Sequence, residues 1–242
     1  MKRAIALLAL TAGLGLTAAT AASAQEPPSC LGVPATITGS GTIVGTDGPD
    51  VIVGSTGNDT ILGLGGDDLI CGGLGNDTID GGDGNDTLIG DSSLSLLLGQ
   101  NGGMNVPGGN DNITGGNGND QILGEAGNDI IDAGNGDDFA TGNVGLDTVS
   151  GGNGNDELFG GPGNDTLNGD NGNDLLIGIF GNDTLNGGRG DDLLDGDLPP
   201  QDESGPPVLD PNPNFDTCNG DQGTDTAFGC EVMTGIESVF GG

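Results

Sequence analysis

The sequence predicts an all-β protein, a right-handed parallel β-roll (β-solenoid) built from coils of about 18 residues. Two observations lead to this fold. A nine-residue motif recurs in fixed phase along most of the chain, and each copy divides into a glycine-rich turn and a short strand. Seventeen units can be aligned, within residues 45–89, 106–195 and 211–228. Two units would make one coil, with turns stacked along both edges of the solenoid.

Four positions of the repeat stay in step along the chain. The sixth is aspartate in every unit, the fourth is glycine in all units except the one with Asn214, and the eighth is apolar. Glycines at the first and fourth positions permit positive φ angles and close backbone approach. The last four positions are too short for a helix, and their single inward apolar side chain suits a strand that packs on its opposite number.

The segments outside the repeats have distinct expected roles. Residues 1–24 combine a basic start, a short apolar stretch and a small-residue end, as in a secretory signal peptide, so the mature chain is expected to start at Gln25 and to be extracellular. Residues 25–44 are an expected N-terminal cap, and residues 211–242 carry the terminal repeats and a C-terminal cap. Residues 90–105 are an interruption, either an irregular coil or a bulged loop. Residues 196–210 form a proline-rich excursion that cannot continue a ladder.

The composition excludes several classes of function. Removal of the signal would leave Arg189 as the one basic residue against 37 acidic ones, which argues against nucleic-acid binding and against adhesion to anionic lipid. The apolar stretch of the signal is too short for a membrane span. Histidine is absent, so a Ser-His-Asp site and a His-ligated zinc site are excluded. So acidic a chain with so few aromatic residues would stay unfolded unless a cation intervened.

The four cysteines predict disulfides, because the exterior of the cell is oxidising and no CxxC spacing occurs. Four cysteines allow three pairings. We prefer Cys30 with Cys71 and Cys218 with Cys230, because each pair lies near one end of the repeat tract.

Stacked coils would place the aspartates of units two apart in one column. At a separation of about 5 Å and an effective dielectric near 20, two such charges repel by about 3 kcal/mol, so the columns forbid folding without counter-ions. Carboxylate and turn carbonyl oxygens, without nitrogen or sulfur ligands, suit calcium better than zinc or magnesium. Three pairs in the first block and eight in the second give roughly eleven sandwiched sites.

The repeat GGxGxDxUx resembles the nonapeptide of the RTX, or haemolysin-type, calcium-binding family, over residues 45–228. In that family calcium lies between adjacent turns, bound by the aspartate and by backbone carbonyls. The resemblance implies several calcium ions here. The implied ligands are the sixth-position aspartates, Asp50, Asp59, Asp68, Asp77, Asp86, Asp111, Asp120, Asp129, Asp138, Asp147, Asp156, Asp165, Asp174, Asp183, Asp192, Asp216 and Asp225. Aspartates at other positions, namely Asp47, Asp80, Asp83, Asp132 and Asp195, are expected to be solvated surface charge.

The sequence therefore predicts a secreted calcium-binding β-roll that folds on calcium and serves as a structural, matrix or adhesion scaffold without catalysis. The alternative is a calcium-binding accessory repeat module of an extracellular hydrolase, which is disfavoured because the short segment before the repeats cannot hold a catalytic domain. A third hypothesis, an ice- or surface-binding solenoid, would need a regular outward array, whereas the third position of the repeat varies. Any partner of the scaffold is expected in the extracellular matrix or on a cell surface.

Overall fold

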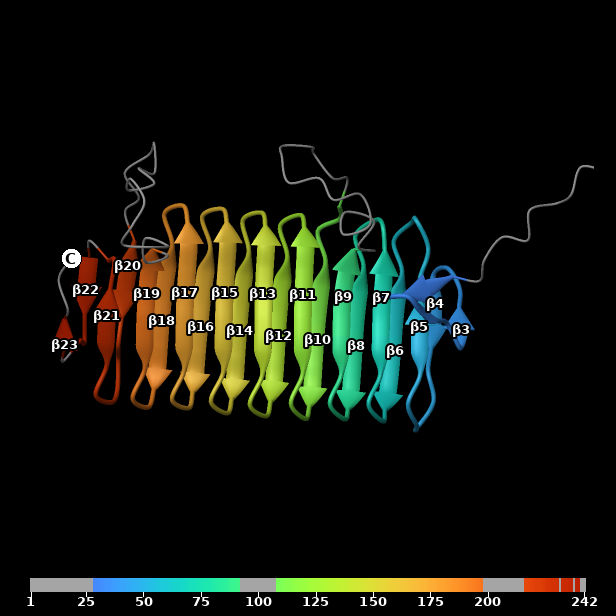
Figure 1. The fold of residues 1–242 in the computed structure, drawn as a ribbon, viewed down its shortest axis with the longest axis horizontal. Coiled ribbons are helices and arrows are strands. Elements are labelled where there is room, and N and C mark those ends of the chain that lie inside the picture. The colour runs from blue at the N-terminus through green and yellow to red at the C-terminus, as the bar shows by residue number, and fades with distance from the viewer. Residues whose placement is uncertain (1–27, 92–107, 198–215, 231, 237, 240–242) are drawn as a thin grey trace, which may run out of the picture.

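The protein is a parallel β-solenoid with two walls (Figure 1). The structure is a computed structural model that describes residues 28–91, 108–197, 216–230, 232–236 and 238–239. Over these residues it contains strands and turns and no helix. Successive strands of one wall pair in parallel with a register of 18 residues, as between Ile131 and Val149. The predicted all-β parallel β-roll, with two nine-residue units in each coil, is therefore confirmed.

Each wall is one sheet, and the chain alternates between the two. The ten-stranded sheet consists of β4 (Thr42–Val44), β6 (Thr60–Gly65), β8 (Thr78–Asp83), β10 (Asn112–Asn117), β12 (Ile130–Asn135), β14 (Thr148–Asn153), β16 (Thr166–Asn171), β18 (Thr184–Arg189), β20 (Thr217–Asn219) and β22 (Val232–Thr234). The eleven-stranded sheet consists of β3 (Ile37–Thr38), β5 (Val51–Val53), β7 (Leu69–Gly73), β9 (Thr87–Asp91), β11 (Gln121–Ala126), β13 (Phe139–Val144), β15 (Glu157–Pro162), β17 (Leu175–Phe180), β19 (Leu193–Asp197), β21 (Thr226–Phe228) and β23 (Ser238–Val239). Before them, β1 (Ser29–Cys30) and β2 (Val33–Pro34) pair in antiparallel fashion.

The core is one column of eighth-position side chains between the sheets. Ile61, Ile70 and Leu176 have no exposed surface, and they belong to a single apolar cluster that runs the length of the solenoid. Burial of one such side chain stabilises the fold by about 2 kcal/mol. The small eighth-position residues Ala140 and Ala227 are equally buried. The expectation of one inward apolar residue per unit is confirmed.

The turns need glycine for two different reasons. Positive φ angles occur at the second and fourth positions, as at Gly82 (104°) and Gly84 (141°). First-position glycines such as Gly81 do not have a positive φ, so that part of the expectation is wrong. A Cβ at Gly81 would instead lie 2.4 Å from Oδ2 of Asp86 and 2.7 Å from the carbonyl oxygen of Gly115. The first position is glycine in most units because the next coil and the aspartate approach it closely, and Ala133 is an exception.

The ladder continues directly across both interruptions. In the first, β8 pairs with β10 so that Thr78 lies opposite Asn112, and the chain advances by 34 residues where a regular coil advances by 18. Asp91 pairs with Gly73, a second-position residue. Gly90 and Asp91 therefore occupy the first two positions of the unit that resumes at residue 108. An alignment of nine contiguous residues begins this unit at residue 106 instead, and so leaves Gly90 and Asp91 outside the repeats.

The second interruption repeats this arrangement. Asp197 pairs with the second-position residue Ile179, and Thr184 lies opposite Thr217, so the chain advances by 33 residues. Each interruption falls between a strand of the eleven-stranded sheet and the next strand of the ten-stranded sheet. Both therefore open on the same edge of the solenoid.

Both preferred disulfides, Cys30–Cys71 and Cys218–Cys230, are confirmed. Cys71 lies on the outer face of the eleven-stranded sheet, where Cys30, Cys71 and Ile89 form a second buried cluster. The bond ties the β1–β2 hairpin to this face. Cys218 is an eighth-position residue of the core.

Two predictions concern features that the structure does not test. The signal peptide lies outside the described residues, and the division of the chain into caps and blocks stays a prediction. Across the ranges given above, no helix is long and apolar enough to cross a membrane.

Candidate metal centre

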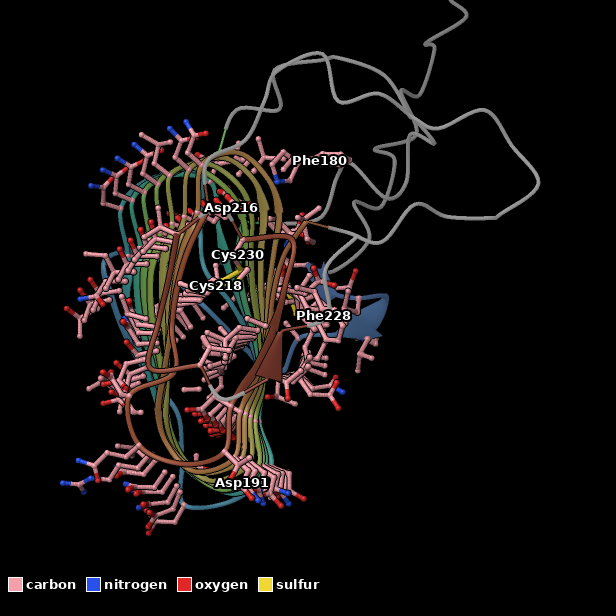
Figure 2. The ribbon with its side chains drawn as sticks, turned by 90° about the vertical axis from the view of Figure 1, so that its left-hand side faces the viewer. Phe180, Asp191, Asp216, Cys218, Phe228 and Cys230 are labelled. Atoms are coloured by element: carbon pink, nitrogen blue, oxygen red, sulfur yellow. A yellow bond between two sulfur atoms is a disulfide. The ribbon has the colours of Figure 1, made fainter. Side chains whose placement is uncertain are left out.

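The sixth-position aspartates lie in two columns, one along each edge of the solenoid. The first aspartate column contains Asp50, Asp68, Asp86, Asp120, Asp138, Asp156, Asp174, Asp192 and Asp225, and the second contains Asp59, Asp77, Asp111, Asp129, Asp147, Asp165, Asp183 and Asp216. All of them are buried. Figure 2 shows Asp216 inside the oval cross-section, whereas the fifth-position Asp191 lies on the outside of the opposite edge.

A repeated hydrogen bond links successive aspartates within each column. The backbone N–H of one aspartate donates to Oδ1 of the aspartate in the next coil, as from Asp120 to Asp138 and from Asp129 to Asp147, both at 2.8 Å. The series is unbroken from Asp50 to Asp225 in the first column. It is also unbroken from Asp59 to Asp216 in the second. One oxygen of each carboxylate is thereby fixed against its neighbour.

The columns contain more adjacent pairs than the two sequence blocks suggested. Eight pairs follow one another in the first column and seven in the second. The eleven pairs counted within the two sequence blocks leave out four that join the blocks, and the number of calcium sites stays a prediction. The pairs that cross the interruptions are Asp77–Asp111, Asp86–Asp120, Asp183–Asp216 and Asp192–Asp225.

The second oxygen of most column carboxylates is buried without a hydrogen-bond donor. The aspartates whose Oδ2 lacks a partner include Asp68, Asp77, Asp86, Asp111, Asp120, Asp129, Asp138, Asp147, Asp156, Asp165, Asp174 and Asp192. Asp50 and Asp59, at the start of the columns, differ. Their Oδ2 atoms accept hydrogen bonds from the backbone N–H groups of Thr46 (2.8 Å) and Ser55 (2.6 Å). A buried carboxylate oxygen with no donor is costly, so a proton or a cation is required there.

The pKa values of the column carboxyls also indicate that positive charge is lacking around them. Burial raises the pKa, the hydrogen bond from the preceding aspartate lowers it, and at most positions neighbouring carboxylates raise it further. The pKa is raised to about 7 at Asp77, Asp120, Asp129, Asp165 and Asp174 and to about 6 at Asp68, Asp111, Asp147, Asp156 and Asp192. Near neutral pH the columns therefore resist full ionisation unless positive charge enters them.

A backbone carbonyl lies near the donor-free oxygen. A Cβ at Gly63 would lie 2.5 Å from Oδ2 of Asp68 and 2.4 Å from the carbonyl oxygen of Gly81 in the next coil, so both oxygens border the same space. Calcium binds six to eight oxygens at about 2.3–2.6 Å. In the part of the chain that the structure describes, no three acidic or cysteine side chains are close enough to hold a metal by themselves. The donor set is thus carboxylate plus carbonyl, which fits calcium.

The five aspartates that were expected to be surface charge are not part of the columns. Four of them, Asp47, Asp80, Asp83 and Asp132, are exposed as expected, and Asp195 is half-buried.

Sequence reasoning missed one buried carboxylate, Asp91. Its side chain is 2 % exposed and its oxygens accept a hydrogen bond from the N–H of Gly109. Burial raises its pKa to about 7. The signal was present in the sequence: removal of residues 92–107 joins Gly90-Asp91 to Gly108-Gly109-Asn110-Asp111 and restores the repeat.

The fold and the two aspartate columns define a class of protein, the parallel β-roll whose turns bind calcium. Comparison with family models identifies the particular family. The RTX calcium-binding nonapeptide repeat (four copies) matches residues 44–79, 72–93, 108–140, 141–176 and 168–198, more than half of the chain. The chain belongs to this family, whose repeats bind calcium, and the many buried aspartates fit several ions. A search of curated proteins found no matching relative.

Proposed function

We propose that the protein is a secreted scaffold of the extracellular matrix or cell surface, which folds when calcium fills the aspartate columns and has no catalytic activity. The observation that carries the proposal is the series of buried Oδ2 atoms without hydrogen-bond donors. The seventeen column aspartates are the proposed side-chain ligands. Calcium supplies the positive charge that the columns lack, so binding energy and folding energy are the same quantity.

The surrounding residues prepare the sites. The N–H of each aspartate holds Oδ1 of the next carboxylate, which leaves Oδ2 directed to the turn, as at Asp129. The first-position glycine, Gly124 in this unit, leaves room between Oδ2 and the carbonyl oxygen of Gly142, which a Cβ would approach to 2.4 and 2.9 Å. The aspartate thus contributes charge, and the glycine contributes space and a carbonyl.

Two disulfides support export, because such bonds persist in oxidising compartments. The composition supports a role without catalysis, because the sequence has no histidine and its only lysine is Lys2. Across the described residues the chain consists of repeat coils and their ends, and no separate catalytic domain is present.

Far-UV circular dichroism with and without calcium tests the folding mechanism. At pH 7 the full chain is expected to gain strand signal when millimolar calcium is added and to lose it with excess chelator, whereas magnesium at the same concentration leaves it unfolded. Equal strand content with chelator and with calcium would refute the proposal. Detection of the chain in culture medium with Gln25 at its N-terminus tests export, and hydrolysis of protein, lipid or polysaccharide substrates would contradict the non-catalytic role.

A further inference from the structure

The first interruption splits one turn of the second aspartate column. Gly90 and Asp91 provide its first two positions, and Gly108, Gly109 and Asn110 provide the next three, before Asp111. A Cβ at Gly90 would lie 2.2 Å from Oδ2 of Asp111, as a Cβ at the first glycine of a regular unit would lie near its own aspartate. The split turn therefore retains the geometry of an intact repeat.

Asp91 places a buried carboxylate at the second position of the turn, whereas the second-position carboxylates Asp170 and Glu125 of uninterrupted turns are exposed and half-buried. In the regular turns of this column the fourth-position N–H donates to a carbonyl of the next coil, as from Gly127 to Val144 (2.9 Å). In the split turn the corresponding N–H, that of Gly109, lies 3.2 Å from both carboxylate oxygens of Asp91. A Cβ at Gly108 would lie 2.1 Å from Oδ2 of Asp91 and 1.9 Å from the carbonyl oxygen of Ala126. This juxtaposition of carboxylate and carbonyl repeats the one found at the column aspartates.

The charge around Asp91 is entirely negative. Asp111 of the same turn acts on it electrostatically, as do Asp77 in the preceding coil and Asp129 and Glu125 in the following one. The Oδ2 atom of Asp111 is buried without a hydrogen-bond donor. Arg189, the one basic side chain in the described chain, belongs to a turn on the opposite edge. The backbone N–H groups of Gly109 and Ala126 both act on this carboxylate, but two neutral donors do not offset this much buried negative charge.

We propose that Asp91 is an additional calcium ligand, outside the repeat pattern, which contributes its carboxylate to an ion held in the split turn together with Asp111 and backbone carbonyls. This assignment rests on the proposed calcium binding by the columns. It gives the second aspartate column one site with more carboxylate charge than its neighbours. Among divalent cations this all-oxygen site favours calcium.

The competing interpretation is that Asp91 only accepts backbone hydrogen bonds, from Gly109 and Ala126. Asp91→Asn separates the two interpretations, because the amide oxygen still accepts hydrogen bonds whereas the charge is lost. Asp170→Asn is the matched control, since Asp170 also occupies a second position, in a turn without interruption, and is exposed. Native mass spectrometry of the full chain at a series of calcium concentrations counts the bound ions.

We expect Asp91→Asn to bind one ion fewer than the unaltered chain, or to fill one site only at tenfold or higher calcium, and Asp170→Asn to match the unaltered chain. Equal ion counts for all three proteins, or equal losses in both variants, would overturn the assignment. A crystal structure of the unaltered chain with calcium decides the matter without a variant. An ion about 2.3–2.6 Å from a carboxylate oxygen of Asp91 supports the assignment, and a carboxylate bound to backbone N–H groups alone overturns it. If the unaltered chain bound no calcium at all, the proposed function itself would fall.

Discussion

Calcium removal should make the stability of this protein depend steeply on pH. Ten column aspartates have a pKa raised to about 6 or 7 from the ordinary value of 3.8, so the folded state binds protons more tightly than the unfolded state. The stability of the calcium-free fold is then fully present below about pH 4 and is lost as the pH rises through 6 to 7.

The size of this loss follows from the number of carboxyls. If solvent screening leaves only one unit of each pKa shift, each carboxyl still costs on the order of 1 kcal/mol, and ten of them cost on the order of 10 kcal/mol. This is comparable with the whole stability of an ordinary domain, about 5–15 kcal/mol. The calcium-free chain should therefore be folded at pH 4 and unfolded at pH 7.

Far-UV circular dichroism of calcium-depleted protein between pH 3 and 8 measures this transition. The strand signal should fall between about pH 4 and 7, and calcium should restore it at pH 7. Sedimentation at each pH controls for aggregation of the nearly neutral acid form. A calcium-free protein with equal or greater strand signal at pH 7 than at pH 4 would refute the reasoning.

Three further predictions concern single changes. Asp165→Asn should lower the thermal midpoint in calcium, because a ligand is lost, and should raise stability without calcium, because repulsion is relieved. Asp132→Asn, at an exposed position outside the columns, should change both far less. Leu176→Ala should cost about 2–5 kcal/mol in urea unfolding with calcium present, because it leaves a cavity in the core, and a loss below about 1 kcal/mol would contradict the assigned packing. Deletion of residues 92–107 should leave the strand signal and the calcium count unchanged, and a loss of either would contradict the split-turn register.

The regular part of the molecule could be predicted because the nine-residue pattern and the pairing of successive coils place the same residues together in every unit. The fixed spacing of the sixth-position aspartates predicted that Asp129 and Asp147 lie in one column. The apolar eighth position predicted that Leu176 lies in the core. A fixed period suffices for these features, since each coil contacts only the coils next to it.

The split units could not be read from a contiguous alignment. Gly90 and Asp91 complete a unit that resumes at residue 108, and the pairing of strands, not the order of residues, makes them neighbours. The same reason hid the buried carboxylate of Asp91. At the N-terminal end, the backbone bonds from Thr46 and Ser55 to the first two aspartates arise from local turn geometry that the period does not encode.

The register across the interruptions has an evolutionary consequence. The pairing of parallel strands does not depend on the length of chain that connects them at the edge. The two long connections preserve the same pairing as the regular coils. The entry and exit points of the first interruption are adjacent, since Asp91 bonds to Gly109, so the closure entropy of an inserted segment grows only slowly with its length. This edge can therefore accommodate a longer or different connecting segment while the pairing of the strands and the aspartate columns stay the same.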